Sequence, residues 1–263
     1  MQLGHLPWTE VPKHSHKVAV VPIGAFEQHG HHLPMLTDSM ICGEIVKRAE
    51  AELGDEAVFL PLLYLGSSDH HRAFTGTISL KWDTYVHVLV DIVESLIGAG
   101  FRKIFLINAH GGNIVPGQTA LYEVNLRHFK DKPDLFLTFV SWFDLARKQV
   151  AALDGVKQDS VLHACEWETS AIMALHPDLV RGEAIKTVRT PFDSRFWSPD
   201  HLGPTRVHVA RTLDQSSPVG ALGYPAESSA DKGARIIAAA TAEVVAFVRE
   251  FATWQRPVHE IVS

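Results

Sequence analysis

The sequence predicts an α/β protein in which a mostly parallel sheet carries helices on both faces. Four short apolar runs have the length and composition of buried strands, at residues 18–23, 58–63, 103–108 and 135–140. Segments with helical periodicity separate these runs, and regular alternation of strands and helices is typical of parallel strands joined by helical crossovers. A chain of 263 residues has room for one large domain or two small ones.

The first half of the chain shows clear helix boundaries. After the first strand, Ser39 is a plausible N-cap for a helix that runs to about Leu53 and stops at Gly54. After the second strand, residues 82–97 carry apolar side chains at helical spacing. Two glycines beyond residue 97 are good C-cap residues, so we expect this helix to end there.

The second half continues the alternation. A helix is expected from about Ile114 to Phe129, between the third and fourth strands. A short helix holds residues 170–175, and a last helix runs from about Ser229 to Phe251. Residues 187–224 are rich in Pro, Ser and Arg without clear periodicity. We interpret that stretch as long loops or short strands beside a site, or as a contact surface.

Bulk composition narrows the class of protein. Apolar residues make up 46% of the chain, which suits an ordinary globular core, and the net charge is −6 with scattered basic residues. This pattern gives no basic footprint for nucleic acid, and no apolar run is long enough to cross a membrane. The start of the chain lacks the pattern of a signal peptide, and two cysteines are too few for a disulfide framework. A cytoplasmic protein is therefore expected.

The most informative segment lies directly after the first strand. Residues 27–38 read Glu-Gln-His-Gly-His-His-Leu-Pro-Met-Leu-Thr-Asp, with two carboxylates and three imidazoles. Glu27 and His29 are two residues apart, so they point to the same side of extended backbone. Carboxylate oxygens and imidazole nitrogens are donors that zinc and manganese accept. Taken alone, Glu27-Gln28-His29 is more consistent with a solvated loop than with a metal site.

Two further clusters repeat this chemistry far along the chain. Residues 108–113 read Asn-Ala-His-Gly-Gly-Asn after the third strand, and residues 163–170 read His-Ala-Cys-Glu-Trp-Glu-Thr-Ser. The carboxyl ends of parallel strands share one edge of a sheet, so the clusters can converge there as a polynuclear metal site. Alternatives are that His110 caps a helix, and that Cys165 beside His163 is a nucleophile; we favour packing for Cys165.

These motifs together resemble the creatininase (creatinine amidohydrolase) family. Phe-Thr-Gly-Thr-Ile-Ser-Leu at residues 74–80 and Gly-Tyr-Pro at 223–225, followed by Ala-Asp-Lys-Gly at 230–233, are similar to further family motifs. The matches extend from about residue 18 to residue 250. The resemblance implies one three-layer α/β domain over residues 1–263. It also implies a cytoplasmic, often hexameric hydrolase of C–N bonds that holds two divalent ions, usually zinc or manganese, with iron as a further possibility.

The resemblance also assigns site residues. It makes Glu27, His29, Asp38 and His110 metal ligands, with Asp38 bridging the ions. Creatininase itself has a glutamate where this chain has Gly112, so one ligand is missing and creatinine is a less probable substrate. Glu168 is the natural replacement. Residues two apart on a helix sit about 200° from each other, so Glu166 and Glu168 cannot both face one metal pair; we assign Glu168 to the metal.

A mechanism follows from this ligand set. Glu27, Asp38 and Glu168 supply three negative charges against four positive ones, so a bridging hydroxide would make the site neutral. Such a hydroxide is available near neutral pH because divalent metals lower the pKa of bound water. It would attack an amide-type carbonyl, and His163 or Glu166 would protonate the leaving nitrogen. We expect substrate contacts from the following residues: His70, Gly111, Gly112 and Asn113.

Other histidines receive lesser roles. His70 is as consistent with a buried structural residue as with a substrate contact, and His71 is expected to have no function. His31 is expected at the rim, and His32 behind the ligands. The predicted function is hydrolysis of a small cyclic amide or formamide by a homo-oligomeric enzyme. The alternatives are a family peptidase, a lactone hydrolase, or a non-catalytic metal- or ligand-binding protein with the same fold.

Overall fold

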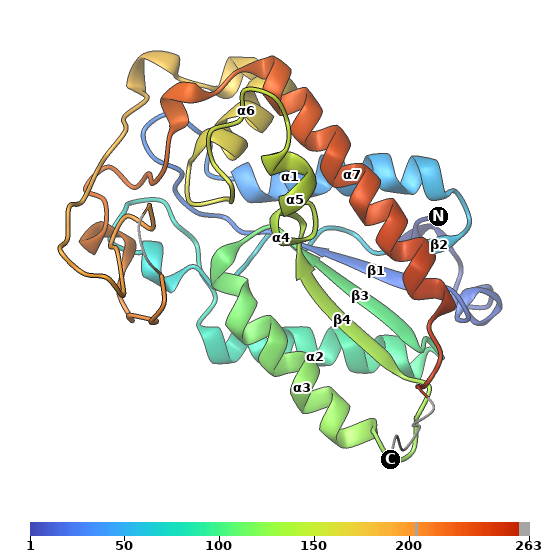
Figure 1. Cartoon of the computed structure of the whole chain (residues 1–263). Helices are drawn as coiled ribbons and strands as arrows, with labels where there is room; N and C mark the ends of the chain where they lie inside the picture. The colour runs from blue at the N-terminus through green and yellow to red at the C-terminus, as the bar shows by residue number, and fades with distance from the viewer. Residues whose placement is uncertain (203–204, 258–263) are drawn as a thin grey trace, which may run out of the picture.

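A four-stranded parallel sheet forms the centre of the molecule (Figure 1). The computed structural model describes residues 1–202 and 205–257. Within these ranges the strand order is β2-β1-β3-β4, and every neighbouring pair is parallel. The strands are β1 (Val18–Ile23), β2 (Ala57–Phe59), β3 (Lys103–Asn108) and β4 (Phe136–Ser141). The predicted α/β class is confirmed.

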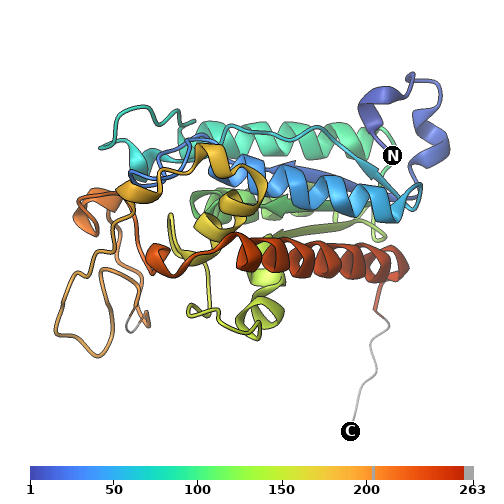
Figure 2. The same ribbon diagram turned by 90° about the horizontal axis from the view of Figure 1, so that it is seen from above.

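Helices cover both faces of the sheet and form the outer layers (Figures 1 and 2). One layer contains α1 (Thr37–Leu53), α6 (Glu166–Leu175) and α7 (Ala230–Thr253). The other contains α2 (Trp82–Gly98) and α3 (Ile114–His128). Successive side chains of a strand point to opposite faces. Val18 and Val20 accordingly join the core beneath α1 and α7, while Ala19 and Val21 join the core beneath α2.

This double burial explains why the strands appear as continuous apolar runs instead of alternating ones. All six residues of β1 are buried. The connections between the main elements contain shorter helical elements. These are α4 (Trp142–Leu145), α5 (Arg147–Ala151), and 3-10 turns at Leu3–His5, Val11–His14, Asp69–His71, Gly111–Asn113, Pro177–Leu179, Gly182–Ala184, Leu213–Gln215 and Pro225–Glu227.

Two predicted boundaries differ from the structure. Helix α1 begins at Thr37, two residues before the predicted cap, because the Thr37 amide and hydroxyl both donate to Pro34 O. Ser39 donates its hydroxyl to Ala25 O instead and thereby ties the helix to the end of β1. The second strand ends at Phe59, since Pro61 has no amide hydrogen for the ladder.

The other predicted elements are confirmed to within a few residues. Ser229 caps α7 by accepting a hydrogen bond from the Lys232 amide. The predicted short helix begins earlier, at Glu166. In residues 187–202 and 205–224 the only helical element is the turn at Leu213–Gln215, and both views place this irregular stretch at the end of the molecule away from the N-terminus (Figures 1 and 2). Within the described ranges, no helix is both long and apolar enough to span a membrane.

Candidate metal centre

The three sequence clusters converge at the carboxyl edge of the sheet. Glu27 and His29 lie on the loop after β1, Asp38 in the first turn of α1, and His110 directly after β3. Glu168 lies in the first turn of α6. All five side chains are buried, and none is more than 4% exposed. Burying three carboxylates together is costly unless cations compensate their charge.

The first candidate ligand set, a group that could hold one metal ion, consists of Glu27, Asp38 and His110. His110 Nδ1 lies 3.1 Å from Glu27 Oε1 and 3.2 Å from Asp38 Oδ2. Ligands about 2.1 Å from a tetrahedral zinc ion are separated from one another by about 3.4 Å. The three side chains are therefore spaced as the ligands of a single ion would be.

The second ligand set consists of His29, Asp38 and Glu168. His29 Nε2 lies 3.1 Å from Asp38 Oδ1 and 3.9 Å from Glu168 Oε1. Asp38 thus belongs to both sets and offers a different oxygen to each. This arrangement is the one that a carboxylate bridging two ions requires.

Unsatisfied oxygen atoms support a metal at this position. Both carboxylate oxygens of Glu27 and Oδ2 of Asp38 are buried without a hydrogen-bond partner among the described residues. Leaving a buried acceptor unpaired costs about 1–3 kcal/mol, and more for a charged group. Because the unpaired atoms face imidazole nitrogens at ligand spacing, the donor set fits divalent ions.

Hydrogen bonds behind the ligands hold them in position. His110 Nε2 lies 3.1 Å from Ser67 O and 3.2 Å from the Ser68 hydroxyl, and His29 Nδ1 lies 3.2 Å from Glu27 O. A proton on each of those nitrogens leaves the lone pair of the other nitrogen directed at the cluster. Glu168 uses Oε2 to accept from the Cys165 amide at 3.1 Å, which leaves Oε1 for the centre.

The electrostatics of the protein show a cluster that attracts positive charge. Burial opposes protonation of His29, but Asp38, Glu168 and Glu27 outweigh it and raise its pKa to about 9. The pKa of His110 is also raised well above its ordinary value, because Glu27 and Asp38 outweigh burial. Burial raises the pKa of Glu168 to about 7, with Asp38 and Glu27 adding to the effect and His29 opposing it. Protons therefore compensate the carboxylates when metal does not.

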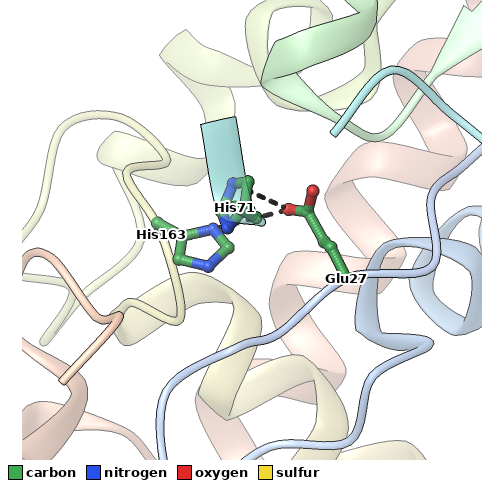
Figure 3. Close-up of side chains that lie close together, drawn as sticks. All are labelled: Glu27, His71 and His163. Carbon is green, nitrogen blue, oxygen red and sulfur yellow. Dashed lines mark ion pairs between the residues drawn. The ribbon is translucent and has the colours of Figure 1, made fainter. Parts of the chain in front are cut away.

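Other histidines near the centre stay neutral. Burial, together with the charge of His29, lowers the pKa of His163 well below its ordinary value. Burial and His110 lower the pKa of His70 to about 4. His163 Nδ1 lies 3.7 Å from Glu27 Oε1, so this predicted catalytic residue does adjoin the ligands (Figure 3).

His71 is the residue that the sequence argument missed. It was expected to have no function, yet it is 2% exposed and its Nε2 lies 3.3 Å from Glu27 Oε1 (Figure 3). Burial and the neighbouring histidines hold its pKa far below the ordinary value. The rings of His70 and His71 both lie beside His110, with centroids 5.5 and 5.9 Å from its ring, and His71 also reaches Glu27. The adjacent pair was a signal of histidines at the centre, but the sequence alone does not say which one contacts the carboxylate.

Glu166 does not join the cluster, and this corrects the predicted catalytic role. Its Oε2 accepts from the Lys157 and Gln158 amides at 2.8 and 2.9 Å. Its Oε1 pairs with Lys232 Nζ at 2.7 Å. The helical geometry that separates Glu166 from Glu168 thus directs Glu166 towards α7, where its carboxylate connects the loop at residues 157–158 with that helix.

The Gly-Gly-Asn segment has three different environments. Gly111 is exposed with open space around it, and is free for contact with a substrate. A Cβ on Gly112 would lie 2.2 Å from Ser67 O and 2.4 Å from His110 Nε2, so no side chain fits there. Asn113 is fully buried; its carboxamide accepts from the Ser67 amide and donates to Gly24 O, so it anchors two loops.

The remaining predicted residues also have defined positions. His70 stacks on His110 with ring centroids 5.5 Å apart. His31 is exposed, whereas His32 is buried and its Nε2 lies 2.9 Å from the Thr169 hydroxyl, behind the ligands. Burial and Glu168 raise the pKa of the Cys165 thiol, so a thiolate nucleophile is not favoured there.

The fold and the site define a class: an α/β protein with a buried carboxylate and imidazole centre, of the kind that metal-dependent hydrolases use. The chain belongs to the creatininase family, because the model of that family, described as creatinine amidohydrolase, matches residues 4–248. The family resemblance of the sequence motifs is thereby confirmed, and family members are hydrolases that act on amide C–N bonds.

Characterised relatives cover several substrates. The chain is 31% identical to creatinine amidohydrolase of Pseudomonas putida over 191 residues, which cover 68% of this chain and 73% of the relative. It is 28% identical to the mycofactocin precursor peptide peptidase of Mycolicibacterium smegmatis over 225 residues, or 84% and 80% of the two chains. It is 31% identical over 136 residues, 47% of this chain and 50% of the relative, to the 2-amino-5-formylamino-6-ribosylaminopyrimidin-4(3H)-one 5'-monophosphate deformylase of Methanobrevibacter smithii.

Solved structures share the fold over nearly the whole chain. A creatininase variant in complex with creatine superposes with a TM-score of 0.76 at 25% identity, covering 96% of this chain and 98% of the other. A Zn–Zn form and a Mn form of creatininase each superpose with a TM-score of 0.75 at 26% identity, covering 95% and 97%.

Proposed function

We propose that this protein is a dinuclear metal-dependent amidohydrolase that cleaves the C–N bond of a small cyclic amide or formamide. The observation that carries the proposal is the pair of ligand sets that share Asp38 at the carboxyl edge of the sheet. Creatininase relatives with Zn–Zn and with Mn support two divalent ions of either kind. Glu27 and His110 would complete one ion's ligands, and His29 and Glu168 the other's.

Charge balance and local geometry give each residue a task. When bound, two divalent ions supply a water of lowered pKa and polarise the carbonyl under attack. The three ligand carboxylates leave one net positive charge to hold the developing oxyanion. His163 is neutral and adjoins Glu27, so its imidazole can accept a proton at Nδ1 and return it to the leaving nitrogen.

Glu168 takes the ligand role that Gly112 cannot fill. The space beside Gly112 is occupied by Ser67 O and the His110 ring, so a glutamate of the kind creatininase has there is excluded unless the loop moves. Glu168 Oε1 instead approaches from α6. The ligand set therefore differs from that of creatininase, which favours a substrate other than creatinine.

The test is metal content per chain by elemental analysis of protein purified without chelator. We expect two ions in the wild type and about one in Glu168→Ala. The matched control is Glu166→Gln, two residues away on the same helix, which should retain two ions. Two ions in Glu168→Ala would transfer the ligand role to another group, and no metal in the wild type would overturn the proposal.

A substrate panel then separates the alternatives. Fully metallated protein is assayed with cyclic amides, formamides, short peptides and lactones. Turnover of peptides alone would favour a peptidase, as in the mycofactocin relative, and turnover of lactones alone an esterase-type hydrolase. No turnover of any compound would favour a metal- or ligand-binding protein on this fold.

We also propose that the protein forms a homo-oligomer. Helix α3 and the residue that follows it expose a row of large apolar side chains, namely Val115, Tyr122, Leu126 and Phe129. Such a row on one helix face is typical of a surface that another chain covers. Sedimentation velocity measures the assembly directly, and a monomer at micromolar concentration would contradict the proposal.

A further inference from the structure

We propose that Gln28 and His71 are positioning residues for the metal ligand Glu27. In this inference the Gln28 carboxamide fixes the tautomer of His71, and the resulting Nε2–H group orients the Glu27 carboxylate. The inference rests on the proposed metal centre, because Glu27 is one of its ligands. The positioning role follows from four observations on buried side chains.

The orientation of the Gln28 carboxamide is determined by a backbone amide. The Gly30 N–H donates to Gln28 Oε1 at 2.8 Å, and an N–H can only donate to an acceptor. The oxygen must therefore face Gly30. The nitrogen Nε2 then faces His71 Nδ1 at 2.9 Å and His163 Nε2 at 3.0 Å.

This orientation decides where His71 carries its proton. Gln28 Nε2 has only hydrogens to offer, so His71 Nδ1 must accept. A neutral imidazole has one N–H, which is left on Nε2. That atom lies 3.3 Å from Glu27 Oε1, so the proton on Nε2 lies beside the carboxylate (Figure 3).

The same argument distinguishes this arrangement from a third ion site. Glu27, His71 and His163 offer ligand atoms close enough to hold an ion. A ligating His71 Nε2 would need its proton on Nδ1, where it would point at the hydrogens of Gln28 Nε2. His163 Nε2 also lies 2.8 Å from Gln28 O, so it too is engaged by Gln28.

The surroundings leave the Gln28 side chain little freedom. Gln28 is buried, and its backbone N–H donates to the Thr77 hydroxyl at 3.2 Å. Gly220 packs against the carboxamide, and a Cβ there would lie 2.2 Å from Gln28 Oε1. Outer partners of this kind commonly affect metal affinity by about 10–100-fold when they are changed.

The first experiment observes the tautomer itself. Protein labelled with nitrogen-15 histidine is examined by long-range proton–nitrogen correlation NMR, both free of metal and loaded with zinc, with His71→Gln used to assign the signal. We expect His71 to carry its proton on Nε2 in both forms. A proton on Nδ1, or a zinc-bound Nε2, would overturn the inference.

The second experiment compares two substitutions by metal affinity, measured by competition with a chelator of known zinc affinity. His71→Gln places an amide N–H near the position of Nε2–H, whereas His71→Leu has no donor. We expect His71→Leu to weaken one of the two ions by about 10–100-fold, and His71→Gln to recover most of that loss. Equal losses in both variants, or a third ion in the wild type, would indicate a ligand role instead.

A remote pair of variants tests Gln28 without removing it. Gly220→Ala pushes on the carboxamide, while Gly54→Ala adds the same Cβ at a similar positive φ, +56° against +66°, with nothing nearby. We expect Gly220→Ala to weaken one ion and to mix the His71 tautomers, and Gly54→Ala to change neither. Equal behaviour of the two would contradict the role of Gln28. Absence of metal in the wild type refutes the metal centre alone, since the tautomer is still read in metal-free protein.

Discussion

Metal binding to the metal-free protein should release about one proton from His29 at pH 8, and His110, whose pKa is also raised, should add to that release. The perturbation is simply the addition of manganese or zinc to protein stripped by a chelator. Both ligand histidines must lose their protons to bind metal, and metal sites generally release protons for this reason. The number released reports the pKa values that the buried carboxylates impose.

The magnitude follows from the structure. With a pKa of about 9, His29 is about 90% protonated at pH 8, and Glu27 and Asp38 shift the pKa of His110 in the same direction. Histidines with the ordinary pKa of about 6.5 would each be only about 3% protonated at that pH. The expected release is therefore about 0.9 proton from His29 plus the share that His110 carries, against less than about 0.1 for the two side chains with unperturbed pKa values. Any proton lost by metal-activated water adds equally to the release expected from perturbed and from unperturbed histidines.

The assay is isothermal titration calorimetry in two buffers with different enthalpies of ionisation. The difference in apparent binding enthalpy between the buffers gives the number of protons released. Repeating the titration at pH 7 should add about half a proton from Glu168, whose pKa is about 7. Equal release at pH 7 and pH 8 from a site that binds both ions would contradict the protonation assigned to Glu168, and release near zero would refute the whole electrostatic account.

The same pKa values predict how pH affects the metal-free fold. His29 has a folded pKa of about 9 and an unfolded pKa of about 6.5. Its contribution to stability is therefore complete below pH 6.5 and is lost as pH rises through 9. Metal-free protein should become less stable over that range. Metal-loaded protein should not show this loss, because binding has already removed the protons.

Three further predictions concern side chains around the centre. Gly112→Ala should displace His110, weaken metal binding and lower the free energy of unfolding by about 1–3 kcal/mol. The adjacent control, Gly111→Ala, should change the free energy of unfolding by less than about 0.5 kcal/mol, because nothing lies near its added Cβ. Equal effects of the two variants in chelator competition and in urea unfolding would contradict the packing argument. Lys232→Met should lower the free energy of unfolding by about 3–5 kcal/mol, because the buried Glu166 side chain loses its ion-pair partner, and adding Glu166→Gln should recover most of that loss. A double variant as unstable as the single one in urea unfolding would show that the pair is not the cause. Asn113→Ala should lower the free energy of unfolding by about 1–3 kcal/mol, because the loops at Gly24 and Ser67 lose their hydrogen bonds to the carboxamide, and it should lower the affinity for the ion at His110. Unchanged urea unfolding would rule out the anchoring role.

The fold was largely predictable because its signals are local or periodic. Buried parallel strands produce apolar runs, and the helix over residues 82–97 follows the apolar spacing of its buried face. The errors have non-local causes. Helix α1 begins at Thr37 because a turn closed by hydrogen bonds from Thr37 to Pro34 O leads into it, and the Ser39 hydroxyl donates to Ala25 O across the loop. The residues near Ser39 in the sequence do not indicate that Ala25 O is its partner.

The candidate site was predictable to the extent that its residue types and their positions after the strands can be recognised in the sequence. A Glu, a His and an Asp after one strand, with His110 after its neighbour, are brought together by the parallel topology alone. Helix geometry separated Glu166 from Glu168, but it did not predict the ion pair of Glu166 with Lys232, which lies 66 residues further along the chain. His71 could not be chosen over His70, since the direction of each side chain depends on how the turn at residues 69–71 packs against His110.

The buried charge of the centre links folding to function. Three carboxylates beside two histidines can be tolerated in the interior only when cations accompany them, and the structure offers either protons or metal ions for that purpose. Ions that bind only the folded chain stabilise it according to their concentration and affinity. The unpaired oxygens of Glu27 and Asp38 therefore predict a metal-free protein that folds but melts at a lower temperature. If chelation left the melting temperature unchanged in a protein shown to bind two ions, these oxygens would have to be satisfied by other groups, and Glu27 would not need the support that Gln28 and His71 provide.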